Sequence, residues 1–221
     1  MWQNREIKFE QGSPEWLDSR LSKLTGSIVG AIMPGKTGKK PNWDKLKYTK
    51  AVQLMAGVDE SKPIPEYNAN WGHDWEPFAC QAYTEVTGTE LIESGLIVSD
   101  FNEYVATSPD RIASDDSVVL EVKCPMTMEK HLQYIDKSPA LSISSVAIEK
   151  SYYWQVRHHM LCTGIKVCDW ASYHHEFKPK EITIDRVEWD DKEMEMMQDY
   201  CNDFIKEMKQ FAKEILTRKD K

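Results

Sequence analysis

Apolar residues recur at helical spacing in six segments of the chain. Ser13 followed by Pro14 is typical of a helix start, with the serine as cap and the proline in the first turn. Glycines at 57, 88 and 164 stop three of the later segments. The spacing predicts a short helix from Pro14 and further helices over 28–33, 44–56, 71–87, 146–163 and 191–217.

Between these segments, short runs of apolar and β-branched residues predict strands. The predicted strands span 91–98, 103–107, 117–124, 167–174 and 182–187. The polar stretch 58–69 is predicted as a connector, and Pro77 is expected in the first turn of its helix or at a kink. The order of helices, three strands, helix, two strands and helix predicts an α/β fold with a central mixed β-sheet flanked by α-helices. Residues 1–221 are predicted to form a single domain because no linker divides them.

Composition favours a soluble globular protein. The chain has 221 residues, 41% of them hydrophobic, and no apolar run approaches the roughly 20 residues of a membrane span. Without a signal-peptide core, cytoplasmic localisation is expected. The five cysteines include no C-x-x-C pair, which indicates neither a disulfide framework nor a zinc ribbon, and we expect reduced, mostly buried thiols.

The charge is unevenly distributed. A formal net charge of −8 argues against nonspecific coating of DNA, which normally needs a basic excess. Lysines nevertheless gather in one segment, and a cleft lined by it could attract a duplex end. The lysines of this segment are Lys36, Lys39, Lys40, Lys45, Lys47 and Lys50, and the first three are the candidate DNA-binding residues.

The most informative chemistry lies between residues 109 and 123. Glu121 and Lys123 alternate with apolar residues, so a strand would place them side by side on one face. A turn at 114–116 would carry Asp110 back toward Glu121 in a hairpin. Two carboxylates suit a hard cation such as Mg²⁺ or Mn²⁺. A lysine beside them can orient a water or help to deprotonate it. An ordinary half-solvated strand is the alternative interpretation.

Four ordered motifs carry a family resemblance. They are Ser108-Pro109-Asp110, Leu120-Glu121-Val122-Lys123-Cys124-Pro125, Trp71-Gly72 followed by Glu76, and Gln155-Val156. From about Gly12 to Trp189 the chain resembles the lambda exonuclease and YqaJ-type viral recombinase family of the PD-(D/E)xK nucleases. The resemblance implies a restriction-endonuclease-like core and a metal-dependent deoxyribonuclease.

The resemblance also implies a role for each residue of the motif. Asp110, Glu121 and the backbone carbonyl of Val122 would bind Mg²⁺, for which Mn²⁺ would substitute, with two ions expected. Lys123 would position the attacking water and offset charge that develops on phosphorus.

Two helical residues join this set by resemblance. Glu76 would help to hold the second ion, and Gln155 would lie close to the metals; an exposed helix acid and a buried glutamine bonded to backbone are the alternatives. Tyr152 and His159 share the helix face of Gln155.

The paired histidines are interpreted as structural or surface residues, because neighbours in sequence point in different directions. These are His158, His159, His174 and His175.

An exonuclease of this family needs a pocket for a terminal 5′-phosphate. Arg20, Ser27 and Ser108 match the family's arginine and serines, and a guanidinium with hydroxyl donors suits the extra charge of that phosphate. Taken alone, Arg20 is better explained as a surface arginine paired with Glu15 or Asp18.

The implied activity is Mg²⁺-dependent 5′-to-3′ resection of linear double-stranded DNA from 5′-phosphorylated ends. It would release mononucleotides and leave 3′ tails for a single-strand annealing protein, and the resemblance implies a trimeric ring.

The chain departs from the family by carrying Lys36 where a loop arginine is expected, and lysine cannot reproduce the planar, forked guanidinium. An endonuclease and a catalytically inactive DNA-binding module are the alternatives. The pair Asp110 and Glu121 weighs against the inactive module, because a site without function would have little physical reason to hold two like charges close together.

Overall fold

The computed structural model of the chain describes residues 1–35, 41–60, 66–136, 150–178 and 180–218. The candidate DNA-binding residues Lys36, Lys39 and Lys40 therefore lie outside the described residues. So does the predicted helical segment 146–149.

A five-stranded mixed sheet forms the centre of the fold, in the order β2-β5-β6-β7-β8. Only β6 and β7 pair in parallel among these neighbours, and the other pairs are antiparallel. Its strands are β2 (Leu91–Ile92), β5 (Arg111–Ala113), β6 (Val119–Lys123), β7 (Val167–Tyr173) and β8 (Ile182–Glu188). A smaller antiparallel sheet has the order β1-β3-β4, with β1 (Glu6–Ile7), β3 (Leu96–Val98) and β4 (Ala106–Thr107).

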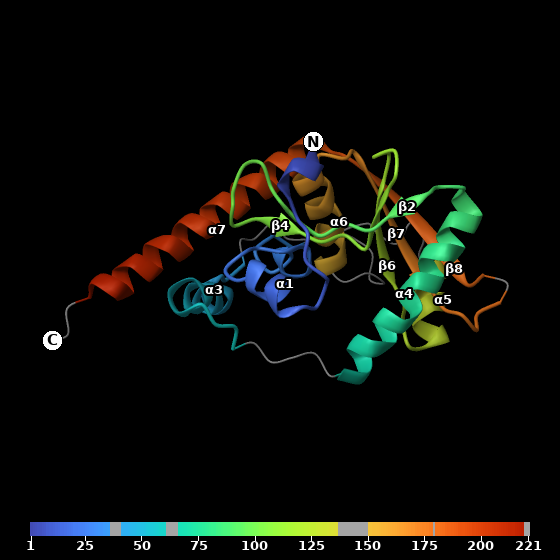
Figure 1. Ribbon diagram of the computed structural model, residues 1–221, viewed down its shortest axis with the longest axis horizontal. Coiled ribbons are helices and arrows are strands. Elements are labelled where there is room, and N and C mark those ends of the chain that lie inside the picture. Colours follow the sequence, from blue (N-terminus) through green and yellow to red (C-terminus); the bar gives the residue numbers. More distant parts are fainter. Residues whose placement is uncertain (36–40, 61–65, 137–149, 179, 219–221) are drawn as a thin grey trace.

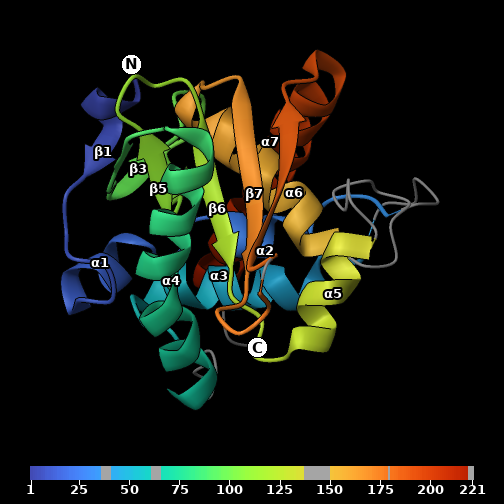
Figure 2. The same cartoon turned by 90° about the vertical axis from the view of Figure 1, so that its right-hand side faces the viewer.

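Helices cover both faces of the five-stranded sheet (Figures 1 and 2). The long helix α7 lies beyond α6 and extends away from the sheet toward the C-terminus (Figure 1), and α3 packs against it. The bounds are η1 (Trp2–Arg5), α1 (Pro14–Ser19), α2 (Gly26–Val29), α3 (Asp44–Ala56), α4 (Glu66–Thr87), α5 (Met128–Asp136), α6 (Lys150–Thr163) and α7 (Asp191–Thr217). This arrangement confirms the predicted α/β fold.

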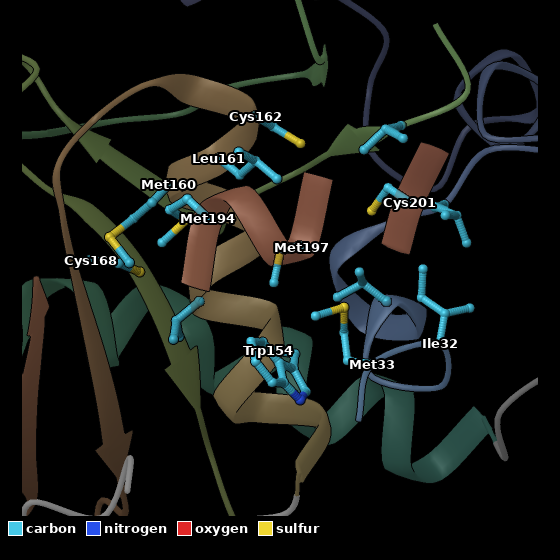
Figure 3. Close-up of a cluster of buried hydrophobic side chains, with 14 of the residues drawn as sticks. Ile32, Met33, Trp154, Met160, Leu161, Cys162, Cys168, Met194, Met197 and Cys201 are labelled. Atoms are coloured by element: carbon cyan, nitrogen blue, oxygen red, sulfur yellow. The ribbon is translucent and has the colours of Figure 1, made fainter. Parts of the chain in front are cut away.

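The core divides at the sheet. On one face, α4 places Ala79 and Tyr83 against Leu120 and Val122. On the other, the larger cluster joins α6, α7, β7 and the segment after α2 (Figure 3). Its labelled members are Ile32, Met33, Trp154, Met160, Leu161, Cys162, Cys168, Met194, Met197 and Cys201.

Strand β6 is buried on both faces. Leu120 and Val122 face α4, and the alternation places Val119, Glu121 and Lys123 on the α6 side. Glu121 is only 2% exposed. The alternation predicted from sequence is confirmed, but a half-solvated strand is wrong, because a central strand in a helix-covered sheet has no solvent face.

The predicted strand 91–98 is in fact two strands in different sheets. Between them, the Gly95 N–H donates to Glu6 Oε1 at 2.8 Å. A side chain at Gly95 would place its Cβ 2.2 Å from the carbonyl oxygen of Ile7, so only glycine permits this approach of β1. The N-terminal strand β1, which periodicity did not predict, thus pairs with β3, whereas β2 pairs with β5 in the other sheet.

Four helical features also differ from expectation. Helix α4 begins at Glu66, so part of the predicted connector is helical, and Pro77 lies in the helix interior rather than its first turn. Helix α5 was not predicted, and helix α2 ends at Val29, so most of the predicted helix 28–33 is not helical. The remaining predicted elements overlap their expected ranges, the five cysteines are free, and four of them are buried. None of the helices described is both long and apolar enough to cross a membrane.

Candidate active site

The β5–β6 hairpin brings Asp110 to the end of β6. Arg111 pairs with Leu120, so Asp110, one residue earlier, comes to lie opposite Glu121. There its Oδ2 accepts a hydrogen bond from the Val122 N–H at 2.6 Å. Because the N–H and C=O of one strand residue point to the same edge, the Val122 carbonyl is directed toward this edge as well.

Glu121 is held by three donors. Lys123 Nζ and Gln155 Nε2, the latter at 2.6 Å, donate to Oε1, and His159 Nε2 donates to Oε2 at 2.8 Å. Burial alone would raise the pKa of Glu121, but the charge of Lys123 and the bond from His159 lower it to about 2. Glu121 is therefore a fixed anion, and three of its roughly four lone-pair directions are used.

Asp110 is the less satisfied carboxylate. Its pKa lies well above the ordinary value, because burial and the negative charge of Glu121 outweigh the charge of Lys123 and the bond from Val122. Among the described residues, the Val122 N–H is the one group that donates a hydrogen bond to the Asp110 side chain. A half-buried carboxylate with unused oxygen ligands beside a second carboxylate fits a hard divalent cation.

Lys123 supplies the positive charge of the cluster. Burial would lower its pKa, but Glu121 and Asp110 together raise it above the ordinary value. Its ammonium also lies 5.1 Å from the centre of the Tyr152 ring. Because its pKa is raised, Lys123 keeps its proton, so its ammonium could act only as a hydrogen-bond donor or a positive charge.

His159 belongs to the cluster, although sequence analysis treated it as structural or surface. Thr107 Oγ1 lies 2.5 Å from its Nδ1, so the ring bridges β4 to Glu121. A Cβ on Gly26 would lie 3.1 Å from the ring and 3.3 Å from Gln155, so the first turn of α2 packs directly against both residues. The available signal was the four-residue spacing from Gln155, which places both side chains on one helix face.

A pocket of about 190 Å³ joins this cluster to the predicted phosphate-binding residues. Arg20, Ser27 and Ser108 line it together with the carboxylates. The full lining is Gln11, Trp16, Arg20, Gly26, Ser27, Ser108, Asp110, Glu121, Lys123, Gln155 and His159. The structure therefore brings together seven residues that were selected from sequence alone.

Arg20 is fixed within this pocket. Its Nη1 donates to Ser108 Oγ at 3.4 Å, and its guanidinium lies 4.1 Å from the centre of the Trp16 ring. Burial lowers the pKa of Arg20 to about 10. Within the described chain it forms no ion pair with Glu15 or Asp18, so the surface-pair alternative is wrong.

Glu76 stands apart from the pocket. It lies on α4 and forms an ion pair with Arg111 at 2.7 Å, and it does not line the cavity. Its charge still contributes to the raised pKa of Asp110. In the described part of the chain, no cluster of three or more acidic, histidine or cysteine side chains could hold a metal ion. The fit to a cation thus rests on Asp110, Glu121 and the strand edge, and a role for Glu76 would require its release from Arg111.

Replacing His159 with Phe should weaken Mn²⁺ binding by about 10- to 100-fold, the usual cost of removing a group that orients a metal ligand. The expected reason is that Glu121 loses the donor to Oε2 and gains rotational freedom. Isothermal titration of Mn²⁺ into the purified protein measures this without any turnover.

His158→Asn is a matched control, because His158 is equally buried on the same helix but contacts Cys162. It should lose stability and keep its Mn²⁺ affinity. Unchanged Mn²⁺ affinity in the Phe variant would show that His159 only fills space.

A family model for the YqaJ-like viral recombinase domain matches residues 15–166, which is more than half of the chain. The chain belongs to the YqaJ-like viral recombinase domain family. The match includes Arg20, Glu76, the β5–β6 hairpin and Gln155, and so confirms the family predicted from the four motifs.

Similar proteins extend this result. An alkaline exonuclease from Laribacter hongkongensis has a TM-score of 0.76 at 23% identity, covering 92% of this chain and 96% of that one. The structure of that enzyme in complex with dAMP gives 0.77 at 24% identity, with the same coverage. A phage-related exonuclease from Haemophilus somnus 129PT gives 0.69 at 13% identity, covering 87% and 96%. These likenesses show a shared fold.

A curated relative also matches in sequence. It is the uncharacterized protein R354 of Acanthamoeba polyphaga mimivirus, 24% identical over 176 residues, which is 75% of this chain. The match spans 29% of that relative's length.

Proposed function

We propose that this protein is a Mg²⁺-dependent 5′-to-3′ exonuclease that resects linear double-stranded DNA from 5′-phosphorylated ends. It would release mononucleotides and leave 3′ single-stranded tails. The family and the shared fold support a nuclease, and the geometry of the pocket supports the finer assignment.

The observation that carries the proposal is one cavity with two chemical halves. Arg20, Ser27 and Ser108 offer a cation and hydroxyl donors, and the other half holds Asp110 and Glu121. A terminal phosphate has one more negative charge and one more free oxygen than an internal phosphodiester, so the first half favours chain ends. The second half would then face the adjoining phosphodiester. The dAMP bound to the related exonuclease is consistent with a mononucleotide product.

Asp110, Glu121 and the Val122 carbonyl would hold Mg²⁺, or Mn²⁺ in its place. When bound, such an ion polarises a phosphoryl oxygen and lowers the pKa of a ligated water. Two ions are proposed, with Glu76 moving from Arg111 to assist the second.

The side chains around the proposed metal site would orient the attacking water and hold the Glu121 carboxylate in place. Lys123 directs its ammonium to the space beside Glu121, where it would orient the attacking water and offset the charge that builds up on phosphorus. Gln155 and His159 keep the Glu121 carboxylate in one orientation. The first turn of α2 closes the pocket behind these two residues.

The deciding experiment compares three DNA substrates, with Mg²⁺ and with chelator. They are a linear duplex with 5′-phosphate ends, the same duplex with 5′-hydroxyl ends, and a covalently closed circle. We expect mononucleotides from the phosphorylated duplex in Mg²⁺, slow release from the hydroxyl duplex, and no product with chelator. Cleavage of the closed circle would overturn the proposal and favour the endonuclease alternative.

Three further assignments remain proposals that rest on the family resemblance. The expected partner is a single-strand annealing protein that coats the 3′ tail, the expected assembly is a homotrimeric ring, and the expected location is the cytoplasm, of a bacterial host if phage-encoded. Light scattering of the purified protein tests the trimer.

A further inference from the structure

The turn that follows Arg20 has an unusual backbone. Ser22 adopts a φ of +56°, in the left-handed region that favours glycine, although it is a serine. The same turn places the Lys23 N–H 3.1 Å from the carbonyl oxygen of Arg20. A non-glycine residue persists in this conformation only where its surroundings hold it there.

Helix α3 supplies that hold through one side chain. Gln53 Oε1 accepts a hydrogen bond from the Ser22 N–H at 2.9 Å and a second from Lys50 Nζ at 2.8 Å. All three residues are buried, with exposed fractions of 8% for Ser22, 5% for Gln53 and 7% for Lys50. Because both groups only donate, the amide of Gln53 has one possible orientation.

The far end of the turn is tied to the strand that leads into the pocket. The Leu24 N–H donates to the carbonyl of Tyr104 at 2.7 Å, and the Ala106 N–H donates to the carbonyl of Leu24 at 2.9 Å. Ala106 begins β4, two residues before Ser108. The turn between Arg20 and Leu24 is thus fixed on one side by α3 and on the other by the segment that carries its pocket partner.

Lys50 is a buried cation close to other cations. Burial and the charges of Arg20 and Lys23 lower the pKa of Lys50 to about 8, against an opposing effect of Asp59. Burying an ammonium beside like charges costs free energy, whereas an apolar side chain would fill the same space without that cost. The lysine keeps the Gln53 oxygen turned toward the Ser22 turn.

We propose that Gln53 is a positioning residue for end recognition, which sets the direction of the Arg20 guanidinium by holding Ser22 in its left-handed conformation. The inference rests on the proposed function of the pocket, because it assigns Gln53 a share in the preference for 5′-phosphate. Gln53 does not line the pocket and acts through Arg20.

The test measures the ratio of initial rates on 5′-phosphate and 5′-hydroxyl duplexes in Mg²⁺. Gln53→Met keeps the side-chain length without an acceptor, and Gln53→Asn is too short to reach the turn. Both should lower the ratio by about 5- to 30-fold, the effect of losing one buried hydrogen bond. Gln53→Glu keeps an acceptor for both donors and should keep the ratio. Gln133→Met, a change of an exposed glutamine on α5, is the matched control.

A double variant separates positioning from a general loss of stability. If Gln53 acts through Arg20, then in an Arg20→Ala background Gln53→Met should further lower neither the rate on 5′-phosphate ends nor the rate on 5′-hydroxyl ends. An equal further loss there would overturn the inference, as would a wild-type ratio in folded Gln53→Met or Gln53→Asn protein. If the Met variant fails to fold in a thermal scan, the milder Asn variant decides. A wild-type protein without any end preference would instead overturn the proposed function, and this inference with it.

Discussion

Asp110→Asn should reduce nuclease turnover by about a thousandfold, the scale expected when a charge-stabilising group is removed from an active site, while the fold becomes no less stable. The asparagine oxygen still accepts from the Val122 N–H, so the hairpin is kept. Substitution removes a negative charge whose pKa is raised by burial and by repulsion from Glu121. Mononucleotide release in Mg²⁺ and thermal unfolding, measured on the same preparation, test both parts.

The gain in stability should depend on pH in a defined direction. A carboxyl whose pKa is raised by folding destabilises the folded state above that pKa, and the penalty disappears below the unfolded value of about 3.9. The melting temperature of Asp110→Asn should therefore exceed that of the wild type near neutral pH, by about 2–4 °C for each kcal/mol of relieved repulsion, and the difference should vanish in acid.

The control for this prediction is Asp74→Asn, which changes an exposed acid on α4. It should keep both turnover and melting temperature. Full turnover in Asp110→Asn would remove the basis for the proposed metal site.

Arg20→Ala should abolish the preference for 5′-phosphate over 5′-hydroxyl ends, with a loss of about 10- to 100-fold in the ratio of rates, since charge-assisted hydrogen bonds contribute about 1.5–3 kcal/mol. Arg20→Lys should recover only part of the ratio, because an ammonium cannot make the two parallel bonds of a guanidinium. The rate on hydroxyl ends should change little, since Arg20 makes no contact with Asp110 or Glu121 among its described interactions.

The matched control is Arg218→Ala, which removes the same charge at an exposed position after α7. It should leave the ratio of rates unchanged. An Arg20→Ala protein with the wild-type ratio would show that the basic half of the pocket does not recognise ends.

The cluster of Asp110, Glu121 and Lys123 was predictable because it depends on local geometry. The twofold alternation of a strand fixes Glu121 and Lys123 on one face, and a short hairpin fixes the position of Asp110. Arg20 and Ser27 are far from this hairpin in sequence, and only the family resemblance connected them to it. Their presence in one pocket is a tertiary result.

Features that depend on buried polar contacts were missed. The inner face of α5 carries His131, whose ring lies 2.8 Å from Ser172 Oγ and 2.9 Å from the Lys180 carbonyl, so a polar residue stands where an apolar one would mark the helix. The contacts of His159 are equally remote in sequence, because its partners Thr107 and Glu121 are 52 and 38 residues away. Spacing along one helix carries no information about such partners.

The small size of the cavity bears on how a duplex could be used. About 190 Å³ is below the roughly 300–1,000 Å³ typical of sites for drug-sized ligands, so under the proposed function the cavity would take one terminal nucleotide rather than a base pair. The terminal base pair would have to fray first, against stacking of about 1.4 kcal/mol per step. Degradation would then start faster at A·T-rich termini than at G·C-rich ones, and a mismatched last pair would remove the difference.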